Sequence, residues 1–236
     1  MKQLLEGKLA PLTDSLGFVQ APLKAVEETY FHWRKNLPYD VNIRRETMNG
    51  TLIDLLPQLE PLGPMKNLFV STQSNWTAYF DNNLNGADVF SHAAYVANVL
   101  GCRAVRLVCC PNSLTSATDS RRGRYGGALF EVTGPDGTPP LMYERTVWAT
   151  NDGGRWSFGA DGTPFPFEET DAYSNRKIKD RLTDEMLERY CAALGIRLFD
   201  QTFYGRQAVL FRQGKDLRSI SLKQRQYDLG IIDALD

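Results

Sequence analysis

The sequence predicts an α+β domain with a largely antiparallel sheet. Runs rich in β-branched and aromatic residues gather in the middle and late parts of the chain, and turn sequences such as GPDG, NDGG and ADG separate them. The helical segments are interspersed among these runs without strict alternation, which disfavours a doubly wound parallel fold. No internal repeat or low-complexity linker interrupts the 236 residues, so we expect one domain over residues 1–236.

The first third of the chain predicts a helix, a strand and a short apolar segment. Residues 22–37 are predicted as the helix, because Val26, Tyr30 and Trp33 recur at helical spacing and a proline follows. The strand is YDVNIRRE, in which apolar and polar residues alternate. The apolar segment GTLIDLLPQLE contains a proline that should break it.

Two strands, a helix and a further strand are expected between residues 67 and 110. The run NLFVSTQSNWTAYFDN predicts a strand pair joined by a short turn, with Trp76 and Tyr79 as half-buried sheet residues. DNNLNG has the composition of a turn and cap, which should lead into the helix GADVFSHAAYVANVLG. CRAVRLVCC then predicts a strand.

The second half of the chain predicts three antiparallel strands, a helix and a last strand pair. The three strands fall within residues 126–169. The helix LTDEMLERYCAALG is the clearest in the protein, because Thr183 can cap its start and a glycine ends it. IRLFDQTFY (196–204) and QAVLFRQG (207–214) predict the strand pair, and residues 217–236 predict a C-terminal docking arm.

Composition and charge limit the function classes. The 27 Lys and Arg balance the 28 Asp and Glu to a net charge of −1, so bulk attraction to nucleic acid or anionic lipid is not indicated. No signal peptide and no apolar run long enough for a membrane helix are found, which predicts a soluble cytoplasmic protein. The four cysteines form no C-x-x-C pair and there are two histidines, so we expect buried free thiols, no metal and no cofactor.

No motif in the sequence specifies a reaction. Ser91 and His92 are neighbours on a predicted helix and therefore do not face each other as members of a catalytic triad would. GRYGG and DGGRW lack the spacing of a nucleotide-binding loop. The run RRGRYGG collects Arg121, Arg122 and Arg124, and this loop is either simply solvated or able to grip an acidic partner or a phosphate.

One resemblance suggests an enzyme. The order of Arg44 in VNIRRE, Ser71 in FVSTQS and Glu168 or Glu169 in FEET is similar to that in ADP-ribosyltransferases of the arginine-serine-glutamate type. This resemblance implies that Arg44, Ser71 and Glu168 are catalytic. The chain departs from the family pattern at Gln73, where a serine is expected, and FEET lacks the Glu-x-Glu spacing.

A second resemblance suggests a binding protein. The runs NWTAYFDNNLNG, GRWSFGADGTPFPFEE and DRLTDEMLERYCAALGI resemble those of bacterial single-domain α+β proteins of the immunity-protein type, which are found beside toxin genes. The resemblance implies a cytoplasmic, cofactor-free protein that binds a protein partner, a toxin, and blocks its active site. A small-molecule sensor with a pocket between sheet and helices is the remaining alternative.

Two surfaces are candidates for the partner. If the toxin acts on nucleic acid, its groove is basic, and the inhibitor should offer acidic groups among aromatic ones. The residues expected to form this acidic patch are Trp156, Asp161, Phe165, Phe167, Glu168, Glu169 and Asp171. The carboxylates at 168–171 also suit the start of a helix. The second candidate surface consists of Trp76, Tyr79 and Asp81.

Overall fold

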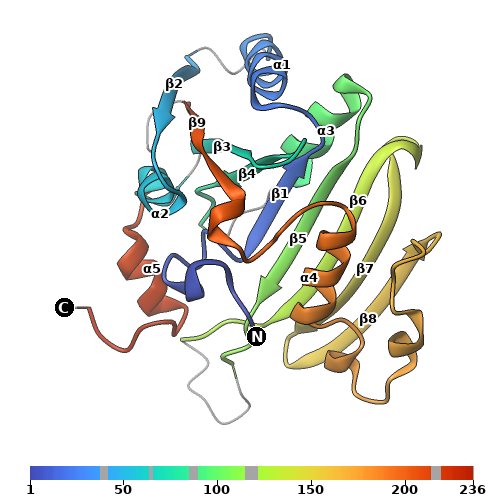
Figure 1. Cartoon of the computed structure of the whole chain (residues 1–236). Coiled ribbons are helices and arrows are strands. Elements are labelled where there is room, and N and C mark those ends of the chain that lie inside the picture. The colour runs from blue at the N-terminus through green and yellow to red at the C-terminus, as the bar shows by residue number, and fades with distance from the viewer. Residues whose placement is uncertain (38–41, 64–65, 85–89, 115–121, 214–218, 236) are drawn as a thin grey trace.

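The computed structural model describes residues 1–37, 42–63, 66–84, 90–114, 122–213 and 219–235. Within these ranges nine strands form one antiparallel sheet in the order β2-β9-β3-β4-β1-β5-β6-β7-β8 (Figure 1). The strands are β1 (Ser15–Val19), β2 (Arg44–Asn49), β3 (Lys66–Thr72), β4 (Thr77–Asp81), β5 (Ala104–Cys110), β6 (Gly127–Thr138), β7 (Tyr143–Asp152), β8 (Arg155–Gly162) and β9 (Tyr204–Arg212). The helices are α1 (Leu23–Lys35), α2 (Leu52–Leu55), α3 (Phe90–Leu100), α4 (Asp184–Ala193) and α5 (Leu222–Asp228). The predicted α+β class with an antiparallel sheet is confirmed.

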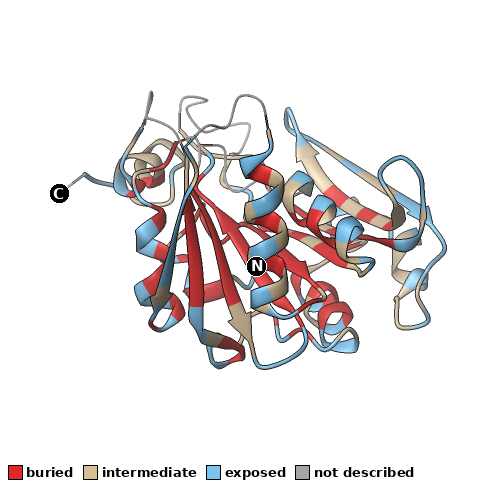
Figure 2. Ribbon diagram, turned by 90° about the horizontal axis from the view of Figure 1, so that it is seen from above, coloured by how far each residue is buried: buried red, intermediate tan, exposed pale blue. Residues whose placement is uncertain are grey.

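The sheet has a hydrophobic core on each face. On the first face α2, α4 and the N-terminal segment pack against a large core that includes Phe18, Phe80 and Phe130. On the second face α1 and α3 cover a smaller core around Phe69 and Phe211. Buried residues therefore gather on the central strands, between helices on both sides (Figure 2).

The helices of the second face cover only part of it. The strand residues of its core come from β1, β3, β4, β5 and β9, and none comes from β6, β7 or β8. In Figure 1, β7 and β8 lie on the far side of β6 from α1 and α3. Within the described ranges, this end of the sheet is thus packed by core residues on its first face alone.

Several predicted elements are confirmed. The hairpin of β3 and β4, the strand β5, and the three strands β6, β7 and β8 lie within the predicted segments. NDGG is the turn between β7 and β8 as expected, but GPDG lies inside β6 and ADG lies inside β8. Helix α4 begins as predicted, because the hydroxyl of Thr183 accepts a hydrogen bond from the N–H of Met186 at 3.3 Å. Helix α3 also fits the prediction from Phe90 onward, whereas the join at 85–89 lies outside the described residues.

Three expectations about strands were wrong or incomplete. In the segment 196–204, which was predicted as a strand, only the last residue belongs to a strand, β9. The preceding residues form an irregular loop and a short 3-10 turn, from which Ile196, Leu198 and Phe203 point into the core. The alternating apolar side chains of this segment pack into the core of the first face, although its backbone does not pair with a strand. Strand β2 begins at Arg44, later than YDVNIRRE suggests, and residues 39–41 lie outside the described ranges. The central strand β1 was missed altogether.

The C-terminal segment docks on its own chain. Gln226 in α5 donates hydrogen bonds of 2.9 Å to the carbonyls of Lys8 and Ala10. Arg122 donates to the carbonyls of Tyr227, at 3.0 Å, and Ile232, at 2.8 Å, and its guanidinium stacks on the Tyr227 ring. The predicted docking arm therefore packs against the N-terminal segment and the loop before β6.

Candidate functional site

The second face of the sheet is open at its β5–β8 end. Strand residues alternate between faces, and Ala128, Phe130, Val147 and Ala149 point into the core of the first face. Their neighbours along the same strands therefore point to the second face, where the described helices α1 and α3 place no core residue against β6, β7 and β8. We call this surface the open face. Its residues are Arg106, Val108, Cys110, Leu129, Thr146, Trp148, Thr150, Ser157, Gly159 and Asp161.

Trp148 is the largest apolar group of the open face. It pairs with Gly159 across β7 and β8, and a Cβ atom at Gly159 would lie 2.0 Å from the indole ring. The glycine therefore allows the indole to lie against the neighbouring strand. Trp148 is partly exposed, and so is Leu129, its partner on β6. Trp is among the residues that most often carry binding energy at protein interfaces, and Leu129 adds apolar area next to it.

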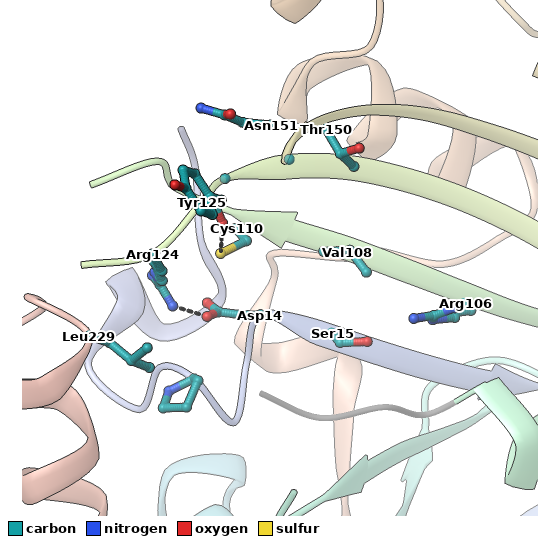
Figure 3. A pocket seen from close by; sticks show the side chains of 13 residues that line it. Asp14, Ser15, Arg106, Val108, Cys110, Arg124, Tyr125, Thr150, Asn151 and Leu229 are labelled. Carbon is teal, nitrogen blue, oxygen red and sulfur yellow. Dashed lines mark hydrogen bonds and ion pairs between the residues drawn. The ribbon is translucent and has the colours of Figure 1, made fainter. Parts of the chain in front are cut away.

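A pocket of about 360 Å³ lies at the end of the open face where β5 stops. Figure 3 shows Asp14 and Arg124 joined at one end and Arg106 at the other, with Cys110 and Val108 between them. Tyr125 and Thr150 lie along the β6 and β7 side. The other lining residues are Pro11, Ser15, Gly126, Gly127, Asn151 and Leu229.

An almost buried ion pair forms one wall of the pocket. The Arg124 guanidinium binds the Asp14 carboxylate, and their side chains are 10% and 7% exposed. Gln3 donates a further hydrogen bond to Asp14 at 3.1 Å. Burial lowers the pKa of Arg124 to about 10, and the guanidinium stays charged at neutral pH beside Asp14.

The pocket contains a thiol that is not activated. Cys110 donates its S–H to the carbonyl of Tyr125, with a distance of 3.6 Å between sulfur and oxygen. Burial, together with a smaller contribution from the neighbouring Cys109, raises the pKa of Cys110 to about 12. The thiol is therefore protonated at neutral pH, and the pocket has no thiolate nucleophile.

The predicted acidic patch does not form one surface. The Glu168 side chain is 0% exposed and receives hydrogen bonds from Arg145 at 2.7 Å and Tyr173 at 2.8 Å. Phe165 and Phe167 stack on each other and pack against the core of the first face. Glu168 therefore holds the segment after β8 onto β7 and offers no charge to a partner.

The remaining members of that patch point in different directions. Asp161 is exposed on the open face, whereas Trp156 belongs to the opposite face of β8. Glu169 pairs with Arg189 of α4 at 2.6 Å, and Asp171 is exposed at the start of a 3-10 turn. The structure thus brings Asp161, and no other member of the predicted patch, onto the open face.

The second predicted surface is in the interior. Trp76 is 2% exposed and donates its indole N–H to the carbonyl of Leu194 at 2.9 Å, while Tyr79 is 0% exposed. Asp81 is also buried. Trp76 and Tyr79 are therefore core residues on opposite faces of the sheet. Both are more deeply buried than the half-buried positions that the sequence predicted.

The ADP-ribosyltransferase-like residues are far apart. Arg44 pairs with Arg212 on β9, and the Ser71 hydroxyl donates to Gln207 on the same strand at 3.0 Å. These positions on β9 are about 17 Å apart at the usual rise per residue. Glu168 contacts β7, five strands from β3, which is about 24 Å at the usual strand spacing. The sheet does not assemble these three side chains into one site.

Sequence reasoning missed a polar network between α1, α3 and the central strands. The Tyr79 hydroxyl contacts His92 Nδ1 and Asn67 Oδ1, each at 2.5 Å, and Arg34 lies 3.0 Å from His92 Nε2. Ring contacts of Tyr30 with His92 extend the network. His92 is therefore packed between helix and sheet, as its place on an apolar helix suggested, and it joins the two helices of the second face.

The arginine-rich loop is used within the chain. Arg122 holds the C-terminal segment and Arg124 binds Asp14, whereas Arg121 lies outside the described residues. Arg124 and Asp14 are 110 positions apart, and nothing in a single sequence links them. Arg124 therefore binds a carboxylate of its own chain, and the grip of this loop on a separate acidic partner or a phosphate stays a prediction.

Searches against protein-family models, curated proteins and solved structures find no match to this chain. No helix among the described residues is long and apolar enough to cross a membrane. The functional argument therefore depends on the geometry of the site itself.

Proposed function

We propose that the chain is a protein-binding factor of the immunity-protein type, which docks its open face against a toxin and blocks the active site of that toxin. The observation that carries the proposal is the open face itself. Among the described residues, α1 and α3 place no core residue against β7 and β8, and Trp148 and Leu129 are partly exposed there, next to a pocket that can receive a side chain of the partner.

The chemistry of the chain supports binding more than turnover. The candidate catalytic residues Arg44, Ser71 and Glu168 are separated, and Glu168 is enclosed by Arg145 and Tyr173. All four cysteines are free, which suits a reducing compartment, and we place the protein in the cytoplasm in this proposal. The resemblance of the sequence to immunity proteins supplies the toxin as the partner.

The open face suggests a partner with a mixed polar and apolar surface. Arg155 and Asp161 lie near the ends of β8 on this face, and Trp148 and Leu129 occupy its middle. An apolar centre inside a charged rim is the arrangement found at specific interfaces. This replaces the expectation of a continuous acidic patch at residues 161–171.

The proposal is tested by capturing the partner with variants of the open face. The tagged protein is incubated with its native cell extract, and stoichiometric partners are identified by mass spectrometry after a moderate-salt wash. Trp148→Arg and Ser157→Arg should each reduce the captured partner at least tenfold, because both place a charge in the contact. Ser157 is exposed, so its replacement leaves the core intact.

Ile53→Arg is the matched control. Ile53 is 47% exposed on α2, away from the open face, and this variant should capture the partner as the unchanged protein does. Thermal unfolding checks that each variant is folded. Undiminished capture by both open-face variants, or no stoichiometric partner for the unchanged protein, contradicts the proposal.

A further inference from the structure

The pocket at the end of the open face combines a wall formed by an ion pair with apolar walls, so it can enclose a small ligand as a flat docking surface cannot. Its polar wall is the pair of Arg124 and Asp14, and its apolar walls are formed by Pro11, Val108 and Leu229. Tyr125 is 44% exposed at the rim, so its ring is available for stacking. A volume of about 360 Å³ is within the range of small-molecule sites.

The polar groups of the pocket are mainly hydrogen-bond donors. The Arg124 guanidinium has five N–H groups, and Asp14 is its one hydrogen-bond partner among the described residues. Thr150 contributes a hydroxyl from β7, for which the described residues provide no partner. The Ser15 hydroxyl is buried nearby and likewise has no partner there. The Arg124 side of the site is therefore matched to acceptor atoms of a ligand, while Asn151 adds a buried acceptor, Oδ1, without a partner among the described residues.

A carboxylate satisfies these donors best. Its two oxygens can accept the paired N–H groups of a guanidinium, which gives a short, directional contact. Arg106 adds a second positive charge at the other end of the pocket, where Glu131 lies 3.8 Å from it. The apolar walls and the Tyr125 ring then require an apolar body on the same ligand.

We propose that this pocket binds a small organic acid, with its carboxylate at Arg124 and Thr150 and an apolar, preferably aromatic, body against Val108, Leu229 and Tyr125. The Cys110 thiol has no nucleophilic role in this proposal, because burial raises its pKa to about 12. This inference does not depend on the toxin-binding proposal, since the pocket forms one end of the open face and its ligand binding is measured without a partner.

Benzoate is the probe, and benzamide is its uncharged control of the same shape. At ten times its dissociation constant, benzoate should raise the unfolding temperature by about 4 °C, while benzamide leaves it unchanged. Calorimetric titration should give one site per chain. No shift with 20 mM benzoate, an equal shift with benzamide, or an equal shift with sodium chloride at the same ionic strength overturns the proposal.

Two conservative variants locate the site. Thr150→Val keeps the shape of the side chain and removes its hydroxyl, and Arg124→Lys keeps the charge beside Asp14 but removes the two-pronged donor. Each should weaken benzoate binding about tenfold, which is the loss expected for one hydrogen bond to a charged group. Thr146→Val, on the same strand and face but outside the pocket, should bind benzoate normally. Unchanged affinity in both pocket variants places benzoate elsewhere and overturns the assignment.

A carboxylate can also come from an acidic side chain of a protein. Acetyl-glutamyl amide carries that carboxylate on a peptide backbone and lacks the aromatic body. Tighter binding of this peptide than of benzoate would assign the pocket to a protein side chain and overturn the small-acid proposal. Weaker binding of the peptide supports it.

Discussion

The centre of the sheet and its β6–β8 end differ in how many of their faces are packed. Strands β3, β4 and β1 are buried on both faces, and all five residues of β1 and of β4 are buried. Strand β7 shows buried and partly exposed residues in strict alternation from Thr146 to Thr150. The first pattern is that of a sheet between two helical layers, and the second is that of a sheet with one free face. The free face is where function can be expected.

The largest expected effect is in the doubly covered centre of the sheet. Phe69 is fully buried on β3 against Tyr30, Tyr79 and Phe211, so Phe69→Ala should lower the free energy of unfolding by about 4 kcal/mol. Leu129→Ala on the open face should cost about 1 kcal/mol, because that side chain is already partly in water. Denaturant unfolding measures both. Equal losses would show that the open face is packed like the rest.

The next effect tests what holds the singly covered end together. Glu168→Gln removes one charge of the buried pair with Arg145 and should lower the free energy of unfolding by about 3 kcal/mol. Glu169→Gln is the adjacent control, since the pair of Glu169 and Arg189 is exposed and should cost less than about 1 kcal/mol. A similarly small loss in the free energy of unfolding for both variants would contradict this account, because it would mean that the buried Arg145 guanidinium does not need the charge of Glu168.

The smallest effect concerns pH. Burial raises the pKa of Cys109 and of Cys110 from 9.0 to about 12. Between pH 9 and pH 12 the unfolded chain therefore loses protons that the folded chain keeps, and stability falls as pH rises. Each thiol contributes at most about 1.4 kcal/mol per pH unit.

Urea unfolding at pH 8 and pH 10 measures this slope. Cys110→Ala should make the decline in the free energy of unfolding with pH shallower, because one of the buried thiols is then missing. The same slope in both proteins would contradict the burial of Cys110 between β5 and the pocket.

The sequence predicted those parts of the fold that local patterns determine. The hairpin of β7 and β8 follows from Gly153 and Gly154 in its turn, and α4 follows from Thr183 and Gly195. The turn between β6 and β7 was misplaced, because GPDG continues β6 and the chain turns at residues 139–142. The central strand β1 was missed because SLGFV is five residues long and buried on both faces, so it lacks alternation. The 196–204 segment was mistaken because apolar side chains can alternate in an irregular loop.

The candidate site was less accessible to sequence reasoning. Glu168 has the local context of an exposed acidic run, and its partner Arg145 lies 23 positions away on another strand. Nothing in the local sequence singles out Trp148, since whether a helix lies opposite β7 is a property of the whole topology. Asp14 and Arg124 meet because β1 and β6 both begin beside the end of β5, and the two residues lie just before these strands.

The central claim is that the open face is the surface that the partner covers. Hydroxyl-radical footprinting of the free protein and of its complex with the captured partner tests it most directly. We predict that Trp148 is oxidised in the free protein and protected in the complex, while Tyr95 on α3 and Leu141 before β7 are oxidised equally in both. Unchanged oxidation of Trp148 in the complex would contradict the account.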